Sequence, residues 1–345
     1  MLLPALTAIA ALLFAALLVD QYRQRRHPYQ LAWALGATAF ALAAAAETLA
    51  SAVGWSEPLY RLWYISGAVW TAGWLGAGTI LLLTKTRFGY WYALCLALAG
   101  LFTVLVARRL EDPSAGPTAL LYALATWCAS TAIGWLTYLG DHRWSRVAVG
   151  FTALLSVLAL PLLVRATLPA PGWAVNSTTG APVALLLPPA LRLLTPLLNI
   201  SGALALVTGA LFSIYVFMPK QRTLPYSSDP GQRGDELLFN LLIAPVAITV
   251  NFVRSIPLAL QAWRAGRLNR RVPATALIAL GAFVPSLTDT LNRTGSTELY
   301  QLGKLAGSVL LLLGFLASVD VIDEIRLPLV GRPLRRALHL LRHPR

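Results

Sequence analysis

The chain has 345 residues, of which 57% are hydrophobic and 12% charged, and its formal net charge is +14. Charged residues make up roughly a quarter of a soluble domain, so the composition excludes an ordinary soluble protein and predicts a membrane protein. The basic residues lie in short segments between apolar runs. We therefore interpret the charge as membrane topology, with anionic lipid headgroups as partners, and expect no nucleic acid.

Nine apolar runs are long enough to cross a bilayer as helices, which takes about 20 residues each. In chain order these runs are 2–19, 31–53, 59–83, 90–107, 118–139, 147–168, 192–218, 273–292 and 299–319. Arginines follow the first run instead of preceding it, which favours a span over a signal peptide. The sequence thus predicts a single all-α domain, a polytopic transmembrane helix bundle of about nine spans.

The short segments between these runs alternate in charge. Those after the first, third, fifth and seventh runs are basic, as at Arg25 and Arg26 or at Lys85 and Arg87. Those after the second, fourth and sixth runs are neutral or nearly so. Because lysine and arginine retain a loop in the cytoplasm, we expect the N-terminus outside and the C-terminus cytoplasmic, in a bacterial inner membrane.

A tenth apolar run, 237–263, differs from the others because arginines follow it directly. They are Arg264, Arg267, Arg270 and Arg271. A crossing at this run would put these four, and the six arginines of the tail 320–345, on the outer side. The positive-inside rule therefore favours a helix that does not cross, with 273–292 and 299–319 forming a hairpin and the tail cytoplasmic.

The polar residues of 237–263 agree with this interpretation. Asn240, Asn251, Arg254 and Gln261 fall on one narrow stripe when successive residues are placed about 100° apart. Such a helix suits the cytoplasmic interface of the membrane, or a re-entrant position within the bundle.

Four ionisable residues inside or beside the spans are candidates for function, because charges at membrane depth are costly. Glu47 and Arg61 flank the outer turn 54–58, and Asp289 and Lys304 flank the turn of the last hairpin. Each pair has two interpretations. It is either an ion pair that ties two helices together, or part of the lining of an outward polar vestibule for a small solute.

The run 59–83 carries aromatic and small residues on separate faces at helical spacing. Trp63, Trp70 and Trp74 share one face, and Gly73 and Ala77 share another. Small residues allow close helix packing in membranes, a theme that Gly202 and Gly209 repeat in 192–218. The tryptophan face has the alternative interpretation of a wall for an apolar ligand.

Residues that would hold a cofactor are poorly placed. The four histidines, His27, His142, His339 and His343, all fall in expected cytoplasmic segments, and Cys95 and Cys128 in spans, where we expect small buried side chains. The chain contains no nucleophile elbow, no phosphate-binding loop and no HExxH motif. We expect no metal, no cofactor and no enzymatic activity.

Several short segments carry a resemblance to known proteins. They are HPYQLAW at 27–33, Glu47, GW at 54–55, YRLWY at 60–64 and LGAGT at 75–79. On these residues the chain resembles a group of uncharacterised polytopic membrane proteins from bacteria. More distantly, over two helices, it is similar to the seven-helix sensor regions attached to some histidine kinases, although it has no kinase domain. The resemblance implies a membrane location and no known activity.

Two classes of function follow. The first is transporter-like handling of a small solute, with Glu47, Arg61, Asp289 and Lys304 as the polar lining. The second is a non-catalytic sensor or accessory subunit that docks a protein partner through its basic cytoplasmic face. The residues of that face are Arg254, Arg264, Arg267, Arg270, Arg271, Arg335 and Arg336.

Overall fold

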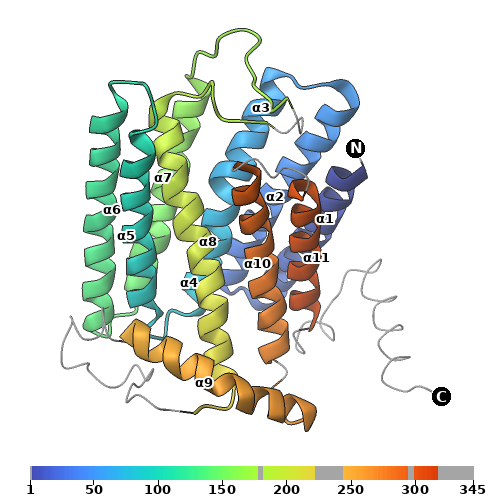
Figure 1. Cartoon of the computed structure of the whole chain (residues 1–345), viewed down its shortest axis with the longest axis vertical. Coiled ribbons are helices and arrows are strands. Elements are labelled where there is room, and N and C mark those ends of the chain that lie inside the picture. Colours follow the sequence, from blue (N-terminus) through green and yellow to red (C-terminus); the bar gives the residue numbers. More distant parts are fainter. Residues whose placement is uncertain (1, 178–181, 222–243, 270, 294–298, 318–345) are drawn as a thin grey trace.

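The computed structural model describes residues 2–177, 182–221, 244–269, 271–293 and 299–317, and over these residues it is all-α, as expected (Figure 1). The helices are α1 (Leu2–Arg25), α2 (Pro28–Val53), α3 (Glu57–Trp63), η1 (Tyr64–Thr71), α4 (Ala72–Leu82), α5 (Phe88–Ala107), α6 (Ala115–Tyr138), α7 (Trp144–Val164), α8 (Pro189–Phe217), α9 (Ala244–Arg264), α10 (Arg271–Arg293) and α11 (Tyr300–Ala317). Counting α3, η1 and α4 as one, ten helices of the described chain are long and apolar enough to cross a membrane. This is a polytopic helical membrane protein.

The long helices run up and down in alternation, so their connections gather at two ends of the bundle (Figure 1). The turns after α1, α4, α6 and α9 lie at one end, which we call the basic end because they carry most of the exposed arginines and lysines. The start of α1 and the segments 165–177 and 182–188 lie at the other, the far end (Figure 1). This arrangement agrees with the alternation of charge along the sequence.

The ninth helix is oriented differently from the rest. Figure 1 shows α9 lying across the basic end, beneath α8 and α10, while the other long helices run along the bundle. One face of α9 is buried against the bundle through Ala247, Ile248 and Asn251, and Ile248 joins a core cluster with Tyr215 of α8. That α9 does not cross the membrane stays a prediction from the charge distribution. Residues 237–243, which begin the predicted segment, lie outside the described residues.

The predicted polar stripe of this segment is wrong in one respect. Asn251 is fully buried, whereas Arg254 and Gln261 are exposed. A further face exposes Val253, Ile256 and Leu260. The boundary between the buried and exposed faces of α9 passes through this stripe. Asn251 therefore faces the bundle, while Arg254 and Gln261, at similar angles, are exposed. Asn240 lies outside the described residues.

Helix α4 and helix α8 approach each other through glycines, as the small-residue pattern predicted. A Cβ atom placed on Gly76 would come 2.6 Å from the Cα of Gly202, and one on Gly209 would come 2.3 Å from the Cγ2 of Thr79. Only glycine permits such backbone contact, which brings the two helices within van der Waals range over several turns. The same device joins α10 to α11, where a Cβ on Gly281 would lie 2.7 Å from the nitrogen of Leu311.

The third membrane-spanning segment contains a π-helix, η1, which the sequence pattern did not reveal. A π-helix turns less per residue than an α-helix, so it changes the direction of the side chains that follow it. Trp63 points to α2, where it bonds to Glu47, whereas the indole N–H of Trp70 donates to the carbonyl of Ser156 in α7. The expected single face of tryptophans is therefore wrong.

Candidate functional site

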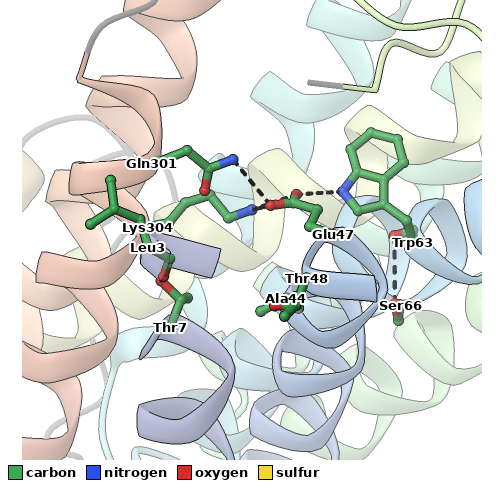
Figure 2. Close-up of polar contacts among 9 residues, drawn as sticks. All are labelled: Leu3, Thr7, Ala44, Glu47, Thr48, Trp63, Ser66, Gln301 and Lys304. Atoms are coloured by element: carbon green, nitrogen blue, oxygen red, sulfur yellow. Dashed lines mark hydrogen bonds and ion pairs between the residues drawn. The ribbon is translucent and has the colours of Figure 1, made fainter. Parts of the chain in front are cut away.

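A buried ion pair joins the second helix to the last described helix near the far end (Figure 2). Glu47 lies six residues before the end of α2, and Lys304 lies one turn into α11. Their exposed fractions are 4% and 8%. The ammonium of Lys304 donates to both carboxylate oxygens, at 2.5 Å to Oε1 and 2.6 Å to Oε2.

Two further donors complete the environment of the Glu47 carboxylate. The indole Nε1–H of Trp63, at the end of α3, donates to Oε1 at 2.8 Å, and the amide Nε2 of Gln301 donates to Oε2 at 3.2 Å. Figure 2 shows the carboxylate held between these groups, with Trp63 on one side and the two α11 residues on the other. A carboxylate that accepts bonds at both oxygens can remain charged when buried.

The network brings together three of the four predicted residues. Asp289, near the end of α10, is partly exposed and lies close enough to Lys304 for their charges to interact. The ammonium of Lys304 also lies over the ring of Tyr300, 5.1 Å from its centre. The Glu47 carboxylate and the Tyr300 ring therefore offset the loss of water around the Lys304 charge, and the more distant charge of Asp289 adds to them.

Arg61 is held elsewhere, so the expected pair between Glu47 and Arg61 is wrong. The guanidinium bonds to Glu57 at 2.6 Å, one turn earlier in the same helix. It also donates to the carbonyls of Leu163 and Ala166, where α7 ends. The last carbonyls of a helix have no partner within it, and Arg61 supplies that partner. Glu57 lies four residues before Arg61 on the same helix, a spacing that favours ion pairs, so Arg61 bonds to Glu57 instead of Glu47.

Sequence analysis missed two members of the network, Trp63 and Gln301. Gln301 precedes Lys304 by three residues, a spacing that places both on one helix face, so its place in the network could have been predicted from the sequence. The place of Trp63 could not have been predicted, because the direction of its side chain depends on how α3 packs against α2. The side-chain oxygen of Gln301 is buried, and it has no hydrogen-bond partner among the residues that the structure describes.

The network is suited to joining helices and is closed to a solute in this state. Every donor around Glu47 is already bonded to it, and a bound molecule would have to displace Lys304 or Gln301. Protonation of the carboxylate would remove the ion pair and leave the Lys304 charge buried. Within the described ranges no three His, Cys, Asp or Glu side chains lie together in a way that could hold a metal ion.

The predicted docking arginines lie apart from this network, at the basic end. Arg254, Arg264, Arg267 and Arg271 are all exposed. The guanidinium of Arg271 lies 5.1 Å from the centre of the Phe217 ring, which fixes the start of α10 against the end of α8. The remaining members of the set, Arg270, Arg335 and Arg336, lie outside the described residues, as does the tail 320–345.

The two cysteines differ in their surroundings. Cys95 is buried in α5, but Cys128 is exposed on α6, so the expectation that both are buried is wrong for Cys128. Helix α6 lies at the edge of the bundle, and much of its surface faces outward (Figure 1). Hydropathy does not distinguish a side chain that faces lipid from one that faces a neighbouring helix.

The sequence matches no protein-family model, no curated protein and no solved structure.

Proposed function

We propose that the chain is a non-catalytic sensor or accessory subunit of a bacterial inner membrane, which docks a protein partner through its basic end. In this proposal the basic end is cytoplasmic and the far end faces outward. The observation that supports this proposal is that buried charges are paired with each other while the arginines of the basic end are exposed. The charges within the bundle are satisfied internally by Glu47 and Lys304, whereas the arginines of α9 are exposed.

The chemistry of the basic end favours an acidic partner surface. Arg254, Arg264 and Arg267 present guanidinium groups that bind carboxylates in a bidentate way. Opposite charges on a partner would speed its association and set its orientation. Since α9 lies on the end of α8, a partner bound there would also press on the helix that packs against α4, α5 and α10.

A photo-crosslinking residue at position 264 tests the docking proposal in cells. We expect one defined adduct with a specific protein at position 264, and none when the same residue replaces Gly116, which is exposed at the far end. A charge-reversed variant, Arg254→Glu with Arg267→Glu, which keeps the photo-crosslinking residue at position 264, should lose the adduct. Equal adducts at both positions, or none at 264, would remove the support for docking.

A second candidate function is transporter-like handling of a small solute through the far end. It is favoured by the buried, unbonded oxygen of Gln301 beside the Glu47 carboxylate, and by the π-helix that follows Trp63. Both features are frequent at functional sites. In a transporter the network between α2 and α11 would open to water during each cycle.

Labelling at position 301 separates the two candidates. Gln301→Cys, with Cys95 and Cys128 replaced by alanine, leaves the Glu47–Lys304 pair in place. A closed accessory subunit should leave this cysteine unlabelled by a membrane-impermeant maleimide, while the control Gly116→Cys is labelled rapidly. Labelling at position 301 at a rate near that of the control would favour the transporter.

A further inference from the structure

A cavity at the basic end lies between three turns of the bundle and has a volume of about 900 Å³. Its walls come from the start of α2, from the end of α4 with the turn that follows, and from the turn between α6 and α7. The lining residues include His27, Tyr29, Lys85, Asp141, His142, Arg143 and Arg146. This cavity is separate from the Glu47 network and from the arginines of α9.

The lining is positively charged. Lys85, Arg143 and Arg146 contribute three cations against the single carboxylate of Asp141. Asp141 only partly neutralises them, because its nearest approach to Arg143 is 3.9 Å and the Arg143 side chain is 78% exposed. The two histidines add imidazole N–H groups, which can donate a hydrogen bond to an anion. Lys85, from the turn after α4, and Arg143 and Arg146, from the turn between α6 and α7 and the start of α7, line the same cavity.

Two tryptophans fix the walls to one another. The indole of Trp33 in α2 donates to the carbonyl of Leu75 in α4, and that of Trp144 in α7 donates to the carbonyl of Thr84, each at 3.1 Å. Trp144 is 1% exposed, so its bond is protected from water. The cavity is therefore held by the packed helices and does not need a ligand to form, which favours binding because little order must be imposed.

Two helices begin at the lining of the cavity, α2 at Pro28 and α7 at Trp144. Their first N–H groups are already bonded, that of Gln30 to the His27 carbonyl and that of Trp144 to the Asp141 carbonyl, so the helices add only the positive end of each dipole. The contacts to an anion therefore fall to the side-chain cations, and the combination of guanidinium and ammonium groups is characteristic of phosphate binding.

The remaining lining gives the cavity an apolar edge. Leu81 and Leu82 line it, and Leu82 is 44% exposed. The imidazole of His27 stacks on the ring of Tyr29, with 5.2 Å between their centres. A phosphate held by the cations would thus have an apolar surface beside it, suited to the glycerol and acyl portions of a lipid or to the organic part of a soluble phosphate ester.

We propose that this cavity binds the phosphate group of an anionic ligand, with Lys85, Arg143 and Arg146 as the contacting cations. Two sources share this chemistry, the headgroup of an anionic phospholipid and a soluble phosphorylated compound. The proposal goes beyond the docking function proposed above and does not depend on it, because none of these three residues belongs to the surface of α9.

The test compares the full chain with two variants that lose the same charge. The cavity variant is Lys85→Gln with Arg143→Gln and Arg146→Gln. The control, Arg108→Gln with Arg109→Gln and Arg165→Gln, removes three exposed arginines at the far end. All six side chains are exposed, so both variants should fold, and thermal unfolding in detergent checks this. The single variant Arg143→Gln serves as a second test.

In the lipid arm, protein from nanodiscs of phosphatidylcholine and phosphatidylglycerol is examined by native mass spectrometry for retained phosphatidylglycerol. In the soluble arm, inorganic phosphate is titrated into protein in phosphatidylcholine nanodiscs. Each lost charge-assisted bond should weaken binding by about tenfold. We expect a loss of about a hundredfold or more in the cavity variant, in at least one arm, and little change in the control.

The pattern of loss identifies the source. Loss confined to the lipid arm assigns the cavity to a phospholipid headgroup, and loss in the soluble arm assigns it to a phosphorylated compound. Equal binding by the native chain and the cavity variant in both arms would overturn the proposal. Equal loss in cavity and control variants would also overturn it, because net charge alone would then explain the binding.

Discussion

At the scale of single residues, the Glu47–Lys304 pair is the feature on which the far end depends. A buried ion pair adds little stability compared with an apolar pair of the same size, because both charges lose their water. Its members are nevertheless hard to change one at a time, since either residue alone leaves an uncompensated charge. The pair therefore determines which helices meet more than it stabilises them.

This argument predicts unequal effects of single and double substitutions. Lys304→Met should lower the free energy of unfolding by about 3–5 kcal/mol, because it leaves the Glu47 carboxylate buried and unpaired. Adding Glu47→Gln should restore most of the loss, since the amide oxygen can still accept from Trp63 and the amide NH2 can donate to the side-chain oxygen of Gln301 once that amide turns over. Unfolding in detergent measures both. A double variant as unstable as the single one would contradict the closed network.

Residue-level prediction from the sequence singled out the charged residues of the spans but paired Glu47 with the wrong partner. Glu47, Asp289 and Lys304 were identifiable because charges are rare in apolar runs. The partner of Glu47 was not, because Lys304 is 257 residues away and no local spacing connects them. The local rule assigned Arg61 to Glu47, although Glu57, four residues earlier on the same helix, was the nearer carboxylate.

At the scale of helices, close contacts between backbones hold the bundle together. Lipid tails are as apolar as leucine, so burial of apolar surface does not drive helices together in a membrane. Close fit does, and the glycines of α4 and α8 provide it at Gly76 and Gly202. The sequence predicted close packing through small residues, at Gly73 and Ala77 and again in 192–218, but it identified neither Gly76 nor α8 as the partner of α4, and the π-helix η1 has no comparable signal in the residues.

A pair of glycine substitutions tests the contribution of this fit. Gly202→Ala should lower the free energy of unfolding by about 1–3 kcal/mol, because its Cβ would lie 2.2 Å from the carbonyl oxygen of Ala72 and the helices must separate. Gly150→Ala in α7 is the control, since no atom lies within 4 Å of the added methyl group. Equal melting temperatures for the two variants would contradict close packing at α4 and α8.

At the scale of the whole molecule, the crosswise helix α9 sets the sidedness of everything after it. If α9 does not cross, α10 and α11 return to the basic end as a hairpin, as Figure 1 shows. The charge distribution predicts this non-crossing arrangement, because positive charge acts on membrane insertion through whole loops. Hydropathy predicts a tenth span instead, since α9 is long and apolar enough to cross.

Cysteine labelling checks this sidedness in the membrane. In a chain without native cysteines, Ala265→Cys after α9 and His142→Cys between α6 and α7 should be labelled from the same side, and Gly116→Cys from the other. The expected side for the first two is the cytoplasm. An impermeant reagent applied to intact cells should reach only position 116. Labelling of position 265 from outside would show that α9 crosses.

The separation of Glu47 from Lys304 along the chain has a consequence for biosynthesis. Ribosomes add about 5–20 residues per second, so the Glu47 carboxylate enters the membrane about 10–50 s before its partner is made. During that interval the α2 carboxylate has no Lys304 to neutralise it, and any chain that stops short of α11 keeps it so. The charge of the α2 carboxylate is therefore neutralised only after the last helix of the described chain has been made.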